Sequence, residues 1–306
     1  MRVDDLPGWL PAWCVDQLGD EPVAVLFERR SISAVVGLRL AGGRDVVVKA
    51  REDDGRAESC VLAQTRLAER GFPCARPLTP VVGVGALAVH AEESRPGGEL
   101  LHGDSPHVAV RYAAVFARLM AELTDVTVAP PLPNPRWARW DHGDPGLWPA
   151  VRVLDERDQS AVPPFVLETA ERARGRLLAA DLPCVLGHAD FEAQNLRWRD
   201  GEVWAVHDWD SLAWQPEAAL VGAASGTFVS VSPPTLAPVE SSAAFLAAYQ
   251  ELRGRVLSTE EQEIAWAASL WPALHNARWE ALHGDPPVCG EAVRAQAAER
   301  LRLANA

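Results

Sequence analysis

The chain has 306 residues, of which 48% are hydrophobic, and its formal net charge is −13. This length and composition are typical of a globular protein that buries a large core and has room for two lobes around a cleft. The negative charge disfavours nucleic acid and anionic membranes as partners, because both are bound through basic surfaces. It permits a cationic ligand without establishing one.

The terminus and the cysteines indicate the compartment. The N-terminus is acidic and lacks an apolar segment, unlike a signal peptide, and no apolar run approaches the ~18 residues of a membrane-spanning helix. The five cysteines are dispersed without C-x-x-C spacing. This pattern favours reduced thiols and therefore a cytoplasmic protein.

The first part of the chain is expected to form a small antiparallel sheet. A short helix is predicted at 7–18, and strands are predicted at 23–27, 34–40, 45–50, 78–84 and 86–91. A hairpin turn at 41–44 joins the second and third strands. A helix follows at 56–70 and stops at Gly71.

Lys49, on the third predicted strand, is the only lysine among 29 Lys and Arg residues. The abundance of Ala, Arg, Gly, Pro and Val suggests a GC-rich gene, in which arginine replaces lysine wherever charge alone matters. A lysine that persists indicates a task for a compact ammonium, such as contact with phosphate oxygens, and chance persistence is the alternative. Glu58, nine residues later in the first turns of the helix, can fold back onto this ammonium.

A polar, Pro- and Gly-rich connector at 92–98 marks the boundary between two lobes. The remainder is predicted to be mostly helical, with an irregular Pro- and Trp-rich insertion at 125–150. The predicted helices are 106–123, 164–180, 240–254, 259–283 and 290–304. A Ser/Pro-rich loop is expected at 225–239.

Residues 185–210 contain the most informative motif: strand, polar loop, strand, turn and strand. His188, Asp190 and Asn195 form an H-x-D-x4-N pattern, and Asp208 follows Asn195 by thirteen residues. Phosphoryl transfer needs a carboxylate that faces the acceptor hydroxyl, and an amide oxygen and a second carboxylate that hold magnesium. A hairpin brings Asn195 and Asp208 together for one metal. The alternative is that these side chains only cap a turn and close a strand.

These pieces occur in the order found in the aminoglycoside phosphotransferase family, the small-molecule branch of the protein-kinase-like fold, and the chain resembles that family over residues 23–250. The resemblance is carried by the segments 46–49, 56–58, 70–73, 188–195 and 207–210. It implies an α+β, two-lobed fold. An antiparallel-sheet N-lobe with one helix, including the hinge, would span 1–96, and a larger, mainly helical C-lobe would span 97–306.

The resemblance also implies roles for the motif residues. Asp190 would orient and deprotonate the acceptor hydroxyl, and His188 would brace the loop. Asn195 and Asp208 would coordinate Mg²⁺. Lys49 would hold the α- and β-phosphates of ATP, with GTP as the alternative donor.

Further nucleotide contacts follow from the same resemblance. Glu58 would position the lysine. The loop at 28–33 would overhang the phosphates, with Ser31 and Ser33 as donors. The connector that starts at Glu92 would contact the adenine through its backbone.

The acceptor is expected to be a small molecule with a hydroxyl group, for which an aminoglycoside or another amino sugar or amino alcohol is one candidate. Carboxylates and indoles near the expected cleft could bind ammonium groups by charge and cation–π contact, although for any one of them surface solvation or core packing is the favoured role. These candidates are Asp210, Trp209, Glu217, Trp279 and Glu280. The sequence leaves a monomer and a homodimer equally open.

Two other functions remain open from the sequence. A metal-dependent hydrolase could use His188, Asp190, His207 and Asp208 as ligands, but it would leave Lys49 without a role. A nucleotide-binding pseudokinase is the second alternative.

Overall fold

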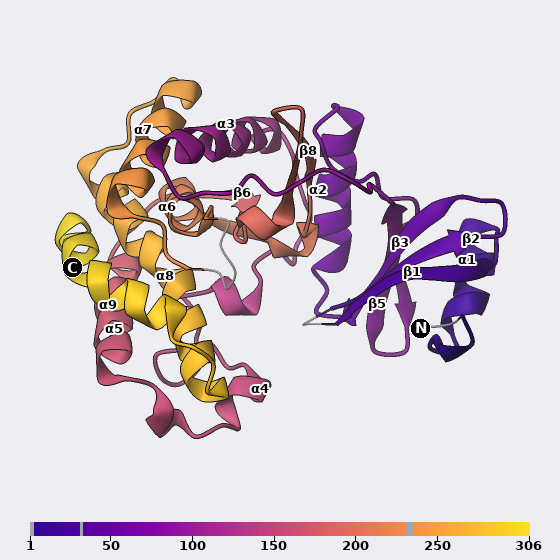
Figure 1. The fold of residues 1–306 in the computed structure, drawn as a ribbon, viewed down its shortest axis with the longest axis horizontal. Coiled ribbons are helices and arrows are strands. Elements are labelled where there is room, and N and C mark those ends of the chain that lie inside the picture. The colour runs from indigo at the N-terminus through magenta and orange to yellow at the C-terminus, as the bar shows by residue number, and fades with distance from the viewer. Residues whose placement is uncertain (1–2, 31–32, 230–234) are drawn as a thin grey trace. The chain divides into compact units, whose positions relative to one another are not determined.

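The structure of the protein is a computed structural model that describes residues 3–30, 33–229 and 235–306 (Figure 1). The chain divides into two units. The first consists of 1–98, 126–132 and 204–209, and the second consists of 99–125, 133–203 and 210–306. The sequence predicted one boundary, between residues 96 and 97. In the structure, the segments 126–132 and 204–209 also belong to the first unit.

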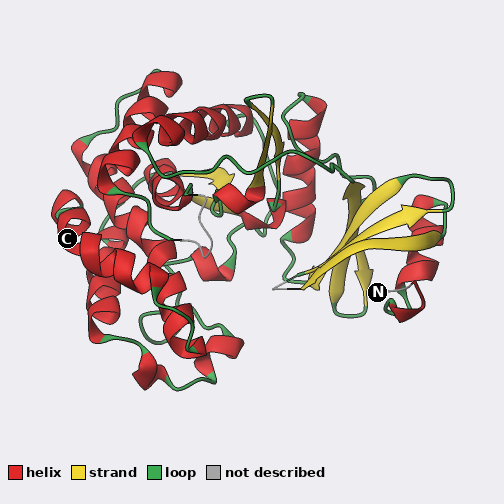
Figure 2. Ribbon diagram, viewed as in Figure 1, coloured by secondary structure: helices red, strands yellow, loops and turns green. Residues whose placement is uncertain are grey.

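A five-stranded antiparallel sheet dominates the first unit, with the strand order β1-β2-β3-β5-β4 (Figure 2). Its strands are β1 (Pro22–Arg30), β2 (Ala34–Leu40), β3 (Asp45–Glu52), β4 (Val82–Val84) and β5 (Leu87–Glu93). In the pairing of β3 with β5, Lys49 lies opposite His90 and Val47 lies opposite Glu92. Because residues directly opposite each other share a face, these four side chains point to the same side of the sheet.

Helices cover both faces of this sheet. Helix α1 (Leu10–Leu18) buries Leu10 and Trp13 against alternate residues of β2, β3 and β5, including Val48 and Ala91. It ends at Gly19, whose φ of +73° is the left-handed conformation that glycine adopts without strain. Helix α2 (Ala57–Glu69) contacts the opposite face, where its polar side chains reach the residues that β3 and β5 direct to that side.

The second unit is mainly helical (Figure 2). Its helices are α3 (Pro106–Leu123), α4 (Arg152–Asp155), α5 (Pro164–Leu178), α6 (Glu217–Thr227), α7 (Val239–Arg253), α8 (Thr259–His283) and α9 (Val288–Leu303). Strand β6 (Cys184–His188) pairs with β9 (Leu212–Pro216), and β7 (Leu196–Arg199) pairs with β8 (Glu202–Val206). A capping box between Ser258 and Glu261 starts α8, because both side chains satisfy backbone amides of the first turn.

Helix α6 and strand β9 are elements that the sequence did not predict. All but two of the α6 residues are buried, so the helix has no polar stripe and no helical period to detect. Gly222 and Gly226 let its backbone approach α8 closely. A Cβ atom on Gly222 would lie 2.1 Å from the Ala265 carbonyl oxygen, so only glycine fits there.

The N-terminal antiparallel sheet and the larger helical remainder confirm the predicted α+β class. The Pro- and Trp-rich insertion is irregular, as expected, with a single-turn 3₁₀ helix, η2 (Arg136–Ala138), and the short α4 near its end. Within the described part of the chain, no helix has the length and apolar character needed to cross a membrane.

Candidate active site

Lys49 forms a buried ion pair with Glu92 in the first unit. The ammonium lies 3.1 Å from Glu92 Oε1, and the two side chains are 9% and 5% exposed. The register explains the pair, because Glu92 opposes Val47 and is therefore the diagonal neighbour of Lys49 on one face. Gln64 of α2 donates from Nε2 to Glu92 Oε2 at 2.8 Å and to the Ala75 carbonyl at 2.8 Å. The buried charges are thus paired and hydrogen-bonded, as burial requires.

Glu58 does not take this place, so the expected Lys49–Glu58 pair is wrong. Its side chain is exposed in the first turn of α2, where a carboxylate is favoured by the helix dipole. The physical reason is that β5 extends to Glu93, beyond the predicted strand end at residue 91, and so supplies a carboxylate from within the sheet. Gln64 was also missed. Its signal was a polar residue on the apolar side of a predicted helix.

The other expected nucleotide contacts have different outcomes. Ser31 lies outside the described residues, and Ser33 is half-buried in a bend just before β2. Glu92 was expected in the connector, with its backbone near the adenine. It belongs instead to β5, and its side chain is bound to Lys49. Its contribution within the first unit is therefore to hold the lysine.

The loop that follows β6 fixes the direction of the Asp190 carboxylate. Asn195 donates from Nδ2 to Asp190 Oδ2 at 2.8 Å and to the Asp190 carbonyl at 2.9 Å. The Asp190 amide donates to Nδ1 of the buried His188 at 3.2 Å, which assigns the imidazole proton to Nε2. Since Nδ2 of Asn195 is used in these bonds, Oδ1 is the atom of this side chain that could bind a metal ion.

Asp208, the second residue after β8, has a left-handed backbone conformation with φ of +60°. The segment is held in the first unit, because the Val206 amide donates to the Pro73 carbonyl at 2.7 Å and Trp209 Nε1 donates to the Val206 carbonyl at 3.0 Å. Non-glycine residues held at positive φ cluster at functional sites. The positive φ therefore supports a functional role for Asp208. The sequence pattern predicted the residue but not its backbone conformation.

The predicted residues divide between the two units. Lys49, Glu92 and Asp208 belong to the first, whereas His188, Asp190 and Asn195 belong to the second. The Asp208 carboxylate and the Asn195 amide oxygen are hard oxygen donors of the kind that Mg²⁺ takes alongside substrate phosphates. Across the described residues, no group of three or more His, Cys, Asp or Glu side chains is arranged to hold a metal ion.

Two of the predicted acceptor-binding residues have structural contacts instead. Trp209 is buried, and its indole nitrogen is bound to the backbone of β8. Glu217, at the start of α6, accepts a hydrogen bond from the Tyr249 hydroxyl. It also pairs with Arg253 at 3.5 Å and with Arg255 at 3.0 Å. Its charge is therefore balanced within the protein.

The remaining acceptor candidates lie in three different environments. Glu280 caps the start of α9, accepting from the amides of Cys289 at 2.7 Å and Gly290 at 3.0 Å. Trp279 is exposed, and its ring stacks on His283 with centroids 4.1 Å apart. Asp210 is half-buried just after Trp209. Thus Glu280, like Glu217, is committed to the fold.

Solved structures of small-molecule kinases share this fold. The amicoumacin kinase hAmiN in complex with AMP-PNP, Ca²⁺ and Ami has a TM-score of 0.62 at 14% identity, over 91% of this chain and 86% of that chain. The microcompartment-associated aminopropanol kinase has a TM-score of 0.61 at 16% identity, over 92% and 91%. An aminoglycoside phosphotransferase from Alicyclobacillus acidocaldarius has a TM-score of 0.52 at 13% identity, over 94% and 93%. No curated protein sequence gives a significant match.

The fold of this chain is therefore the protein-kinase-like fold of these small-molecule kinases. The sequence model of the phosphotransferase enzyme family, APH, matches residues 32–219, which is more than half of the chain. The chain belongs to this family. Its membership confirms the resemblance and sets aside the hydrolase based on His188, Asp190, His207 and Asp208.

Proposed function

We propose that the protein transfers the γ-phosphate of ATP, or of GTP, to a hydroxyl group of a small molecule, with Mg²⁺ as the metal. The observation that carries the proposal is the Asn195 amide, which bonds both the carboxylate and the carbonyl of Asp190. A carboxylate held in one direction suits a base that must face a hydroxyl group. The relative bound to AMP-PNP and Ca²⁺ supports the choice of a nucleotide and a divalent cation.

In this proposal Asp190 accepts the proton of the acceptor hydroxyl while the hydroxyl oxygen attacks the γ-phosphorus. The bond between that phosphorus and ADP breaks, and ADP leaves with the electron pair. Lys49, held by Glu92, donates to the α- and β-phosphate oxygens. Asn195 and Asp208 would hold Mg²⁺, which when bound neutralises phosphate charge.

The test is ADP release from Mg-ATP with pools of hydroxyl-bearing acceptors, comparing the native enzyme with Asp190→Asn. The pools hold aminoglycosides, macrolides, amino alcohols, free sugars and uncharged aromatic alcohols. We expect one pool to stimulate release and Asp190→Asn to reduce it by about 10²–10⁴-fold, the usual contribution of a general base. Affinity for ATP, measured by calorimetry, should stay within about twofold because Asp190 faces the acceptor.

Near-native turnover by Asp190→Asn would refute the assignment of the base. Turnover with any acceptor excludes the pseudokinase, whereas ATP binding without turnover in any pool would favour it. Repeating the productive pool with Mg-GTP decides between the two phosphate donors.

A further inference from the structure

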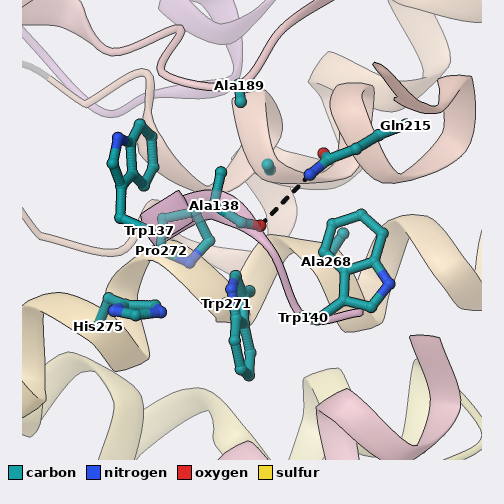
Figure 3. Close-up of a pocket in the computed structure, with 10 residues that line it drawn as sticks. Trp137, Ala138, Trp140, Ala189, Gln215, Ala268, Trp271, Pro272 and His275 are labelled. Atoms are coloured by element: carbon teal, nitrogen blue, oxygen red, sulfur yellow. Dashed lines mark hydrogen bonds between the residues drawn. The ribbon is translucent and has the colours of Figure 1, made fainter. Parts of the chain in front are cut away.

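A small aromatic pocket, partly open to solvent, lies beside the catalytic loop, within the second unit (Figure 3). One of its walls is Ala189, the residue before Asp190. The other walls come from η2 and from the middle of α8, and their rings include Trp137, Trp271 and His275. The free volume is about 20 Å³, which accommodates about one water molecule. A ring bound here would contact Ala189, the chain neighbour of the proposed base Asp190.

Two side-chain nitrogens of the pocket wall have no hydrogen-bond partner among the described residues, and a proline in α8 removes one helical donor beside them. Trp271 is 3% exposed, and within the described residues its Nε1 has no hydrogen-bond partner. The same holds for the buried Nε2 of His275. Pro272 lies inside α8 and has no N–H, so the carbonyl of Ala268, one turn earlier in the wall, receives no helical bond from it. Because buried polar atoms in proteins are normally hydrogen-bonded, these groups can bind a water molecule or a polar atom of a ligand.

The charges around the cavity do not favour a cation. Burial, together with the charges of Arg278 and His142, lowers the pKa of His275 to about 3, so this ring is neutral at pH 7. Arg278 is itself buried, with its guanidinium over the Trp148 ring and 2.9 Å from Asp155. No acidic side chain occurs among the described residues that line the cavity.

The acids close to the insertion are also paired within the protein. Asp144 accepts from Arg136 at 2.8 Å and from the Ala150 amide at 2.9 Å. Asp141 pairs with Arg139 at 3.0 Å. Of the carboxylates that suggested a cationic acceptor from the sequence, Glu217 is likewise bound to arginines and Glu280 caps a helix.

We propose that this cavity binds an uncharged aromatic or alicyclic ring of the acceptor, through an oxygen on that ring that accepts from Trp271 Nε1 or His275 Nε2. The inference rests on the proposed kinase function and names its substrate class: a hydroxylated ring compound without positive charge, in place of an aminoglycoside. Because the free volume matches about one water molecule, a wall would have to move to admit the ring, and Trp137, half-buried on the single turn η2, is the side chain placed to do so. Gln215 secures the neighbouring wall by donating to the Ala138 carbonyl at 3.3 Å (Figure 3).

The experiment measures equilibrium binding by calorimetry without nucleotide, so that it does not depend on turnover. The probes are 4-methoxybenzyl alcohol, its cationic counterpart 4-(hydroxymethyl)benzylamine, and kanamycin. Ala223→Leu fills the cavity from α6, and Trp271→Phe keeps a ring but removes the indole N–H. Ala247→Leu is the matched control, because Ala247 is exposed on α7. ATP affinity and circular-dichroism melting check the folding of each variant.

We expect the uncharged alcohol to bind the native protein roughly tenfold more tightly than the amine, because the cavity lacks a countercharge for a buried cation. Ala223→Leu should weaken the binding of the uncharged alcohol by about tenfold, because the larger side chain occupies the cavity. Trp271→Phe should weaken it by about fivefold, because one hydrogen bond is lost. Ala247→Leu should change nothing.

If the amine or kanamycin binds as tightly as the uncharged alcohol or more tightly, the proposal of an uncharged substrate class is wrong. An unchanged affinity in Ala223→Leu would mean that the ring binds elsewhere. If the uncharged alcohol fails to bind a preparation that binds ATP, the subsite is wrong and the kinase proposal survives. If ATP itself fails to bind, it is the kinase proposal that fails.

Discussion

The buried ammonium of Lys49 relies on Glu92 for a countercharge. Glu92→Gln removes that charge at nearly constant size, and breaking a buried ion pair costs about 3–5 kcal/mol. We expect this variant to lose a comparable part of its free energy of unfolding and to bind ATP more weakly. Urea denaturation and calorimetry with ATP measure the two effects.

Glu58→Gln is the matched control, because Glu58 is exposed and surface substitutions change stability by less than about 0.5 kcal/mol. Comparable losses in the two variants would contradict the assignment of Glu92 as the partner that holds the lysine.

The conformation of Asp208 makes a separate prediction about its backbone. At φ of +60° alanine is strained and glycine is not, so Asp208→Ala should be less stable than Asp208→Gly by about 1 kcal/mol. Both variants should lose phosphate transfer if Asp208 holds the metal. Thermal unfolding and ADP release measure the two properties on the same samples. Equal melting temperatures for the alanine and glycine variants would show that this backbone is not strained.

At the scale of single residues, the sequence identified Asp190 and Asn195 as members of one motif but did not predict the hydrogen bond between them. The spacing of Asp190 and Asn195 within one loop is short, and the structure shows their side chains bonded directly. The partner of Lys49 depends instead on the register of β3 against β5, which no local pattern specifies. The positive φ of Asp208 is likewise set by the packing of its segment rather than by its neighbours in the chain.

Among the secondary-structure elements, those with a clear period were predictable. Strands β2 and β3 and helix α2 match the predicted 34–40, 45–50 and 56–70 closely. Helix α6 was missed because it is apolar on every side, and the extension of β5 was missed because its last residues are acidic and resemble a connector. In both cases tertiary packing overrode the local signal.

The close contact of α6 with α8 can be tested at Gly222. A Cβ there would meet backbone atoms of Ala265 rather than a flexible side chain, so Gly222→Ala must separate the helices. Overpacking of this kind costs about 1–3 kcal/mol or more. Gly175→Ala in α5 is the matched control, since nothing lies within 4 Å of the added methyl group.

The control variant Gly175→Ala should instead have a free energy of unfolding about 0.5–1 kcal/mol higher than the native protein, because alanine has the higher helix propensity. Urea denaturation should therefore show changes of opposite sign in the free energy of unfolding of the two variants. Two changes of the same sign would argue against the tight α6–α8 contact.

For the molecule as a whole, the net charge of −13 says little about its ligand. Glu217, Asp144 and Asp141 are bound to arginines, and Glu280 caps a helix, so these charges stabilise the fold rather than define a cationic site. In our proposal the substrate class depends on which side chains line the cavity near Asp190, and that is a property of the tertiary structure. The sequence could therefore predict the family and leave the acceptor open.

Stability in mild acid is the property of the whole protein that most directly reports on this cavity. The pKa of His275 falls from 6.5 to about 3 on folding, because burial and the nearby Arg278 and His142 disfavour the imidazolium. Between those values the unfolded chain binds a proton that the folded chain does not. The free energy of unfolding should therefore fall as the pH is lowered from 6.5 towards 3, by up to about 1.4 kcal/mol per pH unit from this residue. Above pH 6.5 this contribution is constant.

His275→Asn should flatten this dependence, whereas His107→Gln, a substitution at an exposed histidine on α3, should leave it unchanged. Urea denaturation at several pH values between 4 and 8 gives the slope for each protein. A slope in His275→Asn equal to that of the native protein would mean that His275 gains its proton in the folded state. The cavity wall would then carry a positive imidazolium, which suits an anionic or water-bridged ligand, and an uncharged ring would no longer be its natural ligand. A flattened slope, in contrast, would show that the aromatic wall beside the catalytic loop stays dry and neutral at the pH where the kinase works.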